Sequence, residues 1–548
     1  MTTTSSDQPS PASAGKRVDV EKALLGGSTY KSLGEQKLSP AEERFEKARR
    51  TVGFVLAPLV TVVVYLLPLD LPHEQHALAA VMAGVIIAWI TEPIPIPVSG
   101  LIGVALLVLL GLGGEEGADA VLAPFGSGTI FTFIGAFILA QSMLKHGLAR
   151  RFAFRILAIP GVGTSTTRVI IAFGLITCAL SAFVSNTATV AMLLPTAIGI
   201  LAVIANLIQD KRIEAGEDVS GFDPTRLRVG VAIMLMLAYG ASVGGLLTPV
   251  GSPPNLIGRE LIETATGETI PFAQWMGLAF PVCALMFVAL TIILLLLNKP
   301  EIKNITGVAE YVAEQRREMG SLSTAERNTL IAFAITVSLW ILPGIVALVA
   351  GSESSAYTTV STRLDEGVVA VLGASLLFLL PTSWPRREFT LNWSDAARID
   401  WGTIVLFGTG VIFGTLLADT GLAETIGKGS YNLLGLTSAV AITIFAVVLA
   451  IVVSETTSNT ASAAVVVPII IPIADAAGIN PFVPALAATF AASFGFMLPV
   501  STPQNAIVYG SGAVPITKMI RSGISFDIIG AILILIFLPL LIPVFGLG

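Results

Sequence analysis

Long apolar segments follow one another along most of the chain and are separated by short polar stretches. A helix of about 20 apolar residues crosses the hydrocarbon core of a bilayer. The pattern therefore predicts an all-α integral membrane protein with 11 transmembrane helices. The expected spans are residues 52–69, 76–92, 98–112, 125–144, 229–262, 273–297, 329–349, 366–381, 402–418, 483–513 and 521–546.

Two further apolar segments, residues 166–208 and 434–475, are about twice as long as one bilayer crossing. Each carries the polar triplet Ser-Asn-Thr near its centre, in VSNTATVAMLLP (184–195) and TSNTASAAVVVP (457–468). Each segment could form two full spans joined by a loop, or one re-entrant hairpin. Both alternatives keep the number of membrane crossings that the segment makes even. We favour hairpins because each half is short and its polar centre is flanked directly by apolar helix. Irregular tips at membrane depth are tolerated where they are buried in protein or line a cavity.

The chain also divides into two halves of opposite orientation. FTFIGAFILAQSMLKHGLA (131–149) is echoed by VLFGTGVIFGTLLADTGLA (405–423), with an offset of 274 residues, and the two triplets are offset by 273. We therefore predict an inverted repeat made of residues 51–298 and 329–548, joined by a cytoplasmic loop at 299–328. This is the usual architecture of secondary transporters, whose binding site lies at the repeat interface near the midplane.

Residues 1–50 differ from the rest of the chain, being rich in Ser, Thr, Lys, Glu and Gly. They predict a disordered cytoplasmic tail that ends in a short amphipathic helix, SPAEERFEKARR, with Ser39 as its N-cap. Alternating spans place the Lys and Arg clusters on the same side as this tail. The positive-inside rule makes that side the cytoplasm of a cell inner (plasma) membrane, with the C-terminus outside. The first hairpin then opens to the cytoplasm and the second to the exterior.

Two of the expected spans are interrupted by Pro and Gly. GGLLTPVGSPPN (244–255) and FMLPVSTPQN (496–505) should both unwind, since Pro removes a backbone donor and Gly permits unusual backbone angles. A single break is also typical of a kinked structural helix. Two breaks at matching places in inverted halves indicate a binding site.

The chemistry of these four motifs is unusual because none contains Lys, Arg or His. Broken helix N-termini, Asn amides and hydroxyls suit anions, whereas carbonyl, Asn and Ser oxygens suit a small hard cation. Such a site fits an anion that is bound together with cations.

Two glutamates lie near these motifs. Glu92 is expected to be structural, at a helix end. Glu455 has two possible roles, which are support of the hairpin and part of a cation site.

Composition excludes several classes of protein. The chain is 54% hydrophobic and only 12% charged, where soluble domains carry roughly 25% charged residues. The spans contain no paired aspartates, Ser/His pair or metal cluster, so we expect no enzyme and no organic cofactor. A channel would need a continuous pore lined by rings of like groups, which two off-axis hairpin tips fit poorly.

The paired triplets and the two proline-broken helices resemble the divalent anion/sodium symporter family, which carries dicarboxylates, citrate or sulfate. ASFGFMLPVSTPQNAIV (492–508) fits the signature of that family, and WITEPIPIPVSGLIGVALL and WGTIVLFGTGVIFG are similar to its other recurring segments. The resemblance covers about residues 50 to 548. It implies co-transported sodium ions and a homodimer in the lipid bilayer. Each protomer would have a scaffold domain and a transport domain that moves as an elevator.

The resemblance also implies roles for individual residues. The first sodium site would use the side chains of Ser185 and Asn186, with carbonyls near Ser181 and Gly251. The second would use Asn459, with backbone near Ser454, Thr457 and Ser501. The substrate carboxylates would meet Asn186, Thr187, Ser252, Ser458, Asn459, Thr460, Thr502 and Pro503.

The expected function is thus sodium-coupled symport of a divalent anion. We favour C4-dicarboxylates (succinate, malate or fumarate) because two similar hairpin tips offer two similar donor sets for two carboxylates. A symporter for citrate or sulfate remains an alternative. A sodium-independent exchanger, which would use a basic side chain where a symporter uses sodium, is another alternative.

Overall fold

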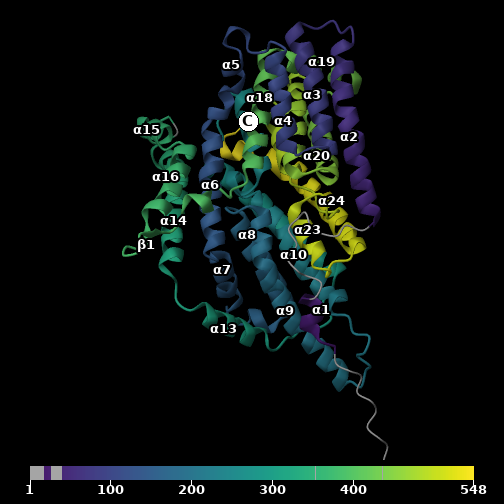
Figure 1. Cartoon of the computed structure of the whole chain (residues 1–548), viewed down its shortest axis with the longest axis vertical. Coiled ribbons are helices and arrows are strands. Elements are labelled where there is room, and N and C mark those ends of the chain that lie inside the picture. The colour runs from purple at the N-terminus through teal and green to yellow at the C-terminus, as the bar shows by residue number, and fades with distance from the viewer. Residues whose placement is uncertain (1–17, 26–39, 352, 435, 548) are drawn as a thin grey trace, which may run out of the picture.

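The computed structural model describes residues 18–25 and 40–547, apart from 352 and 435. Almost all regular structure in these residues is helical (Figure 1). The first half contains α1 Val20–Leu25, α2 Pro40–Leu66, α3 His73–Thr91, α4 Ile96–Leu109, α5 Ala118–Leu122, α6 Gly128–Lys145, α7 Leu148–Leu157, α8 Thr166–Ser181, α9 Asn186–Glu214, α10 Arg228–Gly245, α11 Pro253–Thr266 and α12 Phe272–Leu297. The connection at 299–328, which was predicted as a loop, contains α13 Val308–Met319. The rest of the chain contains α14 Thr324–Ala350, α15 Ser355–Arg363, α16 Glu366–Leu379, β1 Pro381–Ser383, β2 Glu388–Phe389, α17 Trp393–Ala396, α18 Trp401–Asp419, α19 Leu422–Leu434, α20 Ala439–Thr456, α21 Asn459–Ala476, α22 Phe482–Ala491, α23 Pro503–Gly510 and α24 Ile516–Leu541.

Each apolar segment that was expected to span a membrane forms one helix or a broken pair of helices. Within the described residues, 11 helices are long and apolar enough to cross a membrane. They are not the 11 that were predicted, because they include α9, α20 and α21, whereas α4, α16 and α22 are shorter. The agreement in number therefore tests nothing, and the count of crossings stays a prediction.

Two predictions about the N-terminal region were wrong. The amphipathic stretch is not a separate short helix, since α2 runs without interruption from Pro40 to Leu66. No Pro or Gly lies between residues 41 and 52, so nothing ends the helix before its apolar part begins. The predicted cap, Ser39, lies outside the described residues. Part of the tail is also ordered: α1 packs against α9 and buries Val20 and Leu24.

A small sheet departs from the all-α prediction. β1 and β2 pair antiparallel in the polar connection after α16, where the sequence TSWPRREF is too polar to continue an apolar helix. The rest of the described regular structure remains helical. The apolar part of the described chain is thus all-helical, and one two-stranded antiparallel sheet lies outside it.

The order of elements repeats between the two halves. The helices α8, α9 and α10, a break and α11 are followed later by α20, α21 and α22, a second break and α23. In Figure 1, α8 and α9 occupy the lower half of the view and α19 and α20 the upper half. The two hairpins therefore approach the middle of the molecule from opposite ends. This is the order that an inverted repeat requires.

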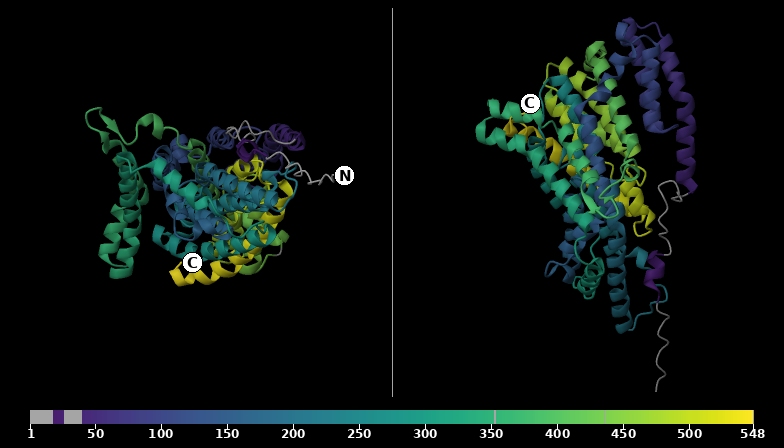
Figure 2. Two further views of the ribbon diagram at one scale, coloured as in Figure 1. Left: turned by 90° about the horizontal axis from the view of Figure 1, so that it is seen from below. Right: turned by 60° about the vertical axis from the view of Figure 1, so that its left-hand side comes forward.

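The helices α14, α15 and α16 stand off to one side of the molecule (Figures 1 and 2). They remain attached because α16 packs along α6. Apolar side chains on their outer faces are largely exposed, for example Leu348 at 89% and Leu379 at 67%. A face of this kind suits contact with lipid or with a second copy of the chain.

Arg151 connects α7 to the start of α14. Its guanidinium makes a bidentate pair with Glu326, at 2.6 and 3.2 Å, and also donates to the backbone carbonyls of residues 319–321. Glu326 in turn completes a capping box with Ser323 at the first turn of α14. Both charged side chains are mostly buried, with 18% and 8% of their surfaces exposed.

Arg151→Met should therefore lower the stability of the folded protein. Removing one partner of a mostly buried ion pair leaves the other charge uncompensated, which costs about 3 kcal/mol or more. We expect a lower midpoint of thermal unfolding in detergent. Arg212→Met is the control, since Arg212 and Glu217 form an exposed pair at 3.8 Å. Equal midpoints in the two variants would contradict this role for Arg151.

Candidate functional site

Each hairpin turn ends at a serine that caps its second arm. Ser185 Oγ accepts a hydrogen bond from the N–H of Ala188 at 3.2 Å, and Ser458 Oγ accepts one from the N–H of Ala461 at 3.2 Å. The first turn of a helix has four N–H groups without an intrahelical partner, and the cap satisfies one of them. The N-termini of α9 and α21 thus keep N–H donors and a positive dipole end, which favour an anion.

The asparagines of the two triplets sit in matching buried pairs. Ser181 Oγ donates to Asn186 Oδ1 at 2.6 Å, and Ser454 Oγ donates to Asn459 Oδ1 at 2.8 Å. Both serines are fully buried, and both asparagines are only 8% exposed. The same pair, five residues apart, thus occurs once in each hairpin.

Both broken helices unwind where the Pro and Gly pattern predicted it. In the first, α10 ends at Gly245, a 3₁₀ turn covers Pro249–Gly251, and α11 begins at Pro253. In the second, α22 ends at Ala491 and α23 begins at Pro503. The two α-helical segments that follow the breaks both start with proline, whose fixed φ suits the first helical position.

A buried asparagine holds each break in shape. Asn255 Nδ2 donates to the carbonyl oxygens ten and seven residues earlier, at 2.7 and 2.8 Å, and Asn505 Nδ2 makes the same two bonds at 2.7 and 3.1 Å. Neither asparagine was predicted to have a role of its own. The available signal was their spacing, since each follows a glycine, Gly245 or Gly495, by ten residues.

The same two glycines bring each break against a triplet. A Cβ on Gly245 would lie 2.5 Å from Asn186 Oδ1, and one on Gly495 would lie 3.0 Å from Asn459 Oδ1. A Cβ at such distances would displace the asparagine oxygen. Glycine is therefore needed for the unwound backbone to approach the triplet in both halves.

Carbonyl oxygens converge beside the first break at Gly251. A Cβ on this residue would lie 2.6 Å from the oxygen of Gly245, 2.8 Å from that of Ala182 and 3.0 Å from that of Ser181. Unwound backbone carbonyls and half-helix C-terminal ends coordinate Na⁺ in transporters of this architecture. Ser181 and Gly251, both named for the first sodium site, are thus brought together, and the oxygen-only donor set fits a sodium ion.

Glu455, whose role could not be decided from the sequence, holds the second break in shape. Its Oε1 accepts the N–H groups of Phe496 and Met497 at 2.5 and 2.8 Å, and its Oε2 accepts from Ser501 Oγ at 2.8 Å. These contacts favour support of the hairpin and its break. The position 273 residues earlier is Ala182, so the second half carries one carboxylate that the first half lacks.

Glu92 has a structural role. It ends α3 in a left-handed conformation, with φ of 47°, and pairs with Arg49 of α2 at 3.3 Å. Arg49 also donates to the carbonyl of Thr456 at the end of α20, at 3.2 Å. The sequence analysis expected Glu92 to be structural, and these contacts agree with that expectation.

The two halves are packed crosswise, which brings the four motifs together. The helix after the second break, α23, packs against α9 and α10 of the first half, and α11 packs against α21 and α22 of the second. Gln504 Nε2 donates to Ser242 Oγ at 3.0 Å across this interface, and Tyr239 Oη donates to the carbonyl of Phe496 at 2.7 Å. The second arm of each hairpin, α9 or α21, therefore packs against the broken helix of the other half.

The residues named for sodium and for substrate differ in exposure. Most of those named for sodium, including Gly251, Thr457 and Ser501, are buried. Among those named for substrate, Thr187, Ser458 and Thr460 are partly exposed and Pro503 is exposed, whereas Ser252 and Thr502 are buried. Thr502 Oγ1 accepts the N–H of Asn505, so that oxygen already serves as a helix cap.

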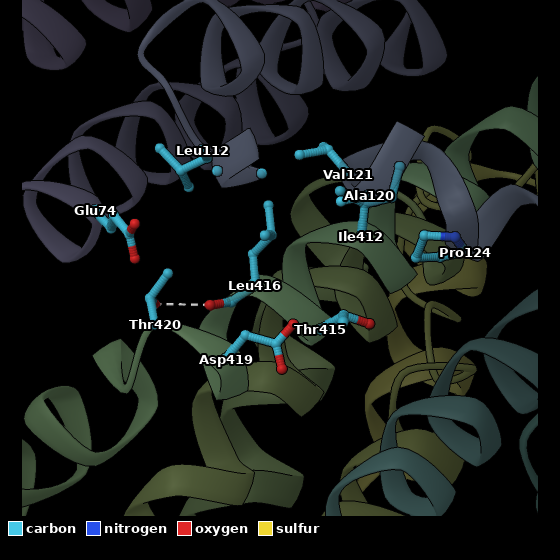
Figure 3. A pocket seen from close by; sticks show the side chains of 12 residues that line it. Glu74, Leu112, Ala120, Val121, Pro124, Ile412, Thr415, Leu416, Asp419 and Thr420 are labelled. Atoms are coloured by element: carbon cyan, nitrogen blue, oxygen red, sulfur yellow. Dashed lines mark hydrogen bonds between the residues drawn. The ribbon is translucent and has the colours of Figure 1, made fainter. Parts of the chain in front are cut away.

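A cavity of about 260 Å³ between α3 and α18 is not part of this site (Figure 3). Its lining includes two carboxylates, Glu74 and Asp419, and no basic residue. Figure 3 shows these two side chains on the α3 side and the α18 side of the cavity. A surface with two carboxylates and no basic group repels a dianion.

Residues 48–545 match the family described as sodium:sulfate symporter transmembrane region. The chain belongs to this family. The resemblance drawn from the triplets and broken helices is thereby confirmed, and the match extends over almost the whole chain.

Two relatives in the family are similar along nearly their full length. The sodium-dependent dicarboxylate transporter SdcS of Staphylococcus saprophyticus is 31% identical over 509 residues, which cover 92% of this chain and 93% of the relative. The transporter of the same name from Staphylococcus aureus is 29% identical over 501 residues, which cover 91% and 92%. Family membership identifies a multi-pass membrane transporter, which is consistent with the expectation of no enzyme.

Two solved structures share the fold at low sequence identity. The YdaH transporter of Alcanivorax borkumensis superposes with a TM-score of 0.51 at 14% identity, over 86% of this chain and 99% of that one. MtrF of Neisseria gonorrhoeae gives a TM-score of 0.50 at 13% identity, over 87% and 97%. The likeness shows a fold that membrane transporters use.

Proposed function

We propose that this chain is a secondary active transporter that carries a dicarboxylate together with sodium ions. The observation that supports this proposal is that both hairpins have a similar arrangement. A buried cluster of serine, asparagine and backbone oxygens lies beside the N-terminus of a long helix, and no motif contains a basic residue. The second cluster also contains the carboxylate of Glu455, which accepts from Ser501 Oγ. Sodium in the oxygen clusters supplies the positive charge that a dianion requires, and the helix N-termini supply N–H donors. Both relatives described above are named sodium-dependent dicarboxylate transporters.

The sodium sites follow from the buried oxygens. We assign Ser181, Asn186 and Gly251, which lie near the converging carbonyls, to the first site, together with Ser185. We assign Ser454, Asn459 and Ser501, which lie around Gly495, to the second site, together with Thr457. The substrate carboxylates meet the more accessible side of the same tips. Two similar tips suit two carboxylates, so we propose succinate, malate or fumarate, with citrate and sulfate as competing substrates.

One observation weighs against a sodium-independent exchanger. The basic residue closest in sequence to the first break is Arg259, four residues after Asn255. Its guanidinium pairs with Glu263 at 2.9 Å and with Glu366 at 2.6 Å, so its charge is already neutralised. A substrate anion would have to displace these carboxylates in order to use it.

We further propose an elevator motion between two groups of helices. One group consists of α2, α3, α4, α6, α14, α16 and α18, and the other contains the hairpins and broken helices with α12 and α24; packing is extensive within each group. Polar bridges between the groups, such as Arg259 to Glu366 and Arg49 to the carbonyl of Thr456, have to break during the motion. In this proposal the protein is a homodimer in the plasma membrane, with its N-terminus in the cytoplasm and its C-terminus outside.

Uptake of labelled succinate into proteoliposomes should be driven by an inward sodium gradient. Symport predicts saturable uptake that collapses when sodium is equal on both sides or is replaced by choline. Exchange predicts the opposite pattern, with equal rates with and without the gradient and strong acceleration by internal dicarboxylate. A panel of unlabelled malate, fumarate, citrate and sulfate, added as competitors, then ranks the anions.

A further inference from the structure

Four arginines line a cavity of about 540 Å³ at the lower end of the molecule in Figure 1, between α7 and α13. Arg151 and Arg155 come from α7, and Arg316 and Arg317 come from α13. The lining residues in the described part of the chain include no Asp, Glu or His. The other lining residues are Ala313, Met319, Gly320, Ser321 and Leu322.

Only one of these four charges is neutralised within the described residues. Arg151 pairs with Glu326, whereas Arg155, Arg316 and Arg317 are exposed and make no ion pair among the described residues. An arginine cannot lose its proton at physiological pH, so the three guanidinium charges persist. Three unpaired arginines around one concave surface form a strongly positive site.

The positions of the two helices are set by contacts outside the cavity. Arg150 of α7 donates to Gln315 of α13 and lies 5.7 Å from the ring centroid of Phe154. The rings of Phe154 and Tyr311 pack with centroids 6.2 Å apart. The arginines are therefore presented by a fixed pair of helices, and little order has to be gained when an anion binds.

The cavity lies where the chain enters a helix with an apolar outer face. Leu322 at its rim is 42% exposed, and Ile331 and Ile335 follow on α14 with 43% and 42% exposed. Only 17% of the 18-residue apolar stretch of α14 is buried inside the protein. If α14 faces lipid, the cavity is at the level of the headgroups, with apolar surface leading from it along the acyl chains.

We propose that this cavity binds the phosphate group of an anionic phospholipid headgroup. Planar guanidinium groups match the geometry of phosphate oxygens, and basic pockets beside spanning helices bind anionic headgroups. A soluble phosphate compound offers the same chemistry, but it would not use the exposed apolar residues that adjoin the arginines. The proposal rests on the membrane-embedded arrangement and not on transport activity, so it can fail or succeed independently of sodium-coupled uptake.

Native mass spectrometry of the purified full-length protein in detergent tests this site. With equimolar phosphatidylglycerol and phosphatidylcholine, the wild type should retain phosphatidylglycerol preferentially. The triple variant R155Q/R316Q/R317Q should lose that preference by roughly 100-fold, because three interfacial charges are lost. The variant R386Q/R387Q/R398Q is the matched control, because it removes three charges elsewhere and should keep the preference.

Inorganic phosphate and glycerol 3-phosphate, added at millimolar concentration, distinguish a phospholipid headgroup from a soluble phosphate compound as the ligand. If they do not displace phosphatidylglycerol, the lipid assignment is supported. Stabilisation by phosphate that depends on the three arginines, without any preference for phosphatidylglycerol, would overturn the lipid source in favour of a soluble phosphate. A triple variant that keeps the wild-type lipid preference would overturn the site altogether.

Discussion

Gly251→Ala is expected to weaken sodium-driven dicarboxylate uptake strongly, through a loss of sodium affinity. The added Cβ would lie 2.6 to 3.0 Å from three backbone carbonyl oxygens, and backbone, unlike a flexible side chain, does not give way cheaply. The methyl group would thus occupy the place where these oxygens converge and force them apart. Losing one contact to a charged group, worth about 1.5–3 kcal/mol, lowers affinity roughly 10- to 100-fold. Sodium activation of succinate uptake in proteoliposomes measures this directly.

The control for this variant is another buried glycine. Gly410→Ala in α18 places its Cβ 3.8 Å from the Cβ of Ala464, which is ordinary van der Waals contact. It should retain uptake and sodium affinity. Thermal unfolding in detergent separates loss of the site from loss of the fold. Wild-type sodium activation in folded Gly251→Ala would show that the converging carbonyls do not bind the coupling ion.

The turns at the two triplets and the two breaks could be predicted because their signals are local. A polar triplet in an apolar segment, and Pro with Gly inside an expected span, each name a short stretch whose backbone cannot remain ordinary helix. Repetition of both signals at nearly constant offset then assigned the stretches to two halves. The helices that carry these stretches pack against one another because α11 and α23 cross to the opposite half.

The parts that were not predicted depend on partners far away in the chain. The role of Asn255 and Asn505 becomes visible only when the break folds back and places two carbonyls beside each amide. Glu455 could be support or ligand until the structure placed Phe496 and Ser501 against it. The docking of α1 on α9 depends on two apolar residues, Val20 and Leu24, in an otherwise polar tail, which is too weak a pattern to read alone.

The second large effect is expected for Asn186→Asp and Asn459→Asp. Each substitution keeps the shape of the side chain and an oxygen that accepts from the neighbouring serine, Ser181 or Ser454. It adds a negative charge beside the proposed dianion. At roughly 5 Å and an effective dielectric of 20, one pair of charges repels by about 3 kcal/mol, which is a factor of about 100 in affinity.

The two kinds of variant should fail in different ways, which makes them a joint test of the site. An added carboxylate attracts cations, so sodium affinity in the Asp variants should be kept or increased while the affinity for succinate falls. Gly251→Ala should instead lose sodium affinity first. Asn480→Asp is the control, because Asn480 Oδ1 accepts the N–H of Phe482 at the start of α22 and an aspartate oxygen can do the same. If both Asp variants transport like the wild type, the triplets do not contact the substrate and the site has to lie elsewhere.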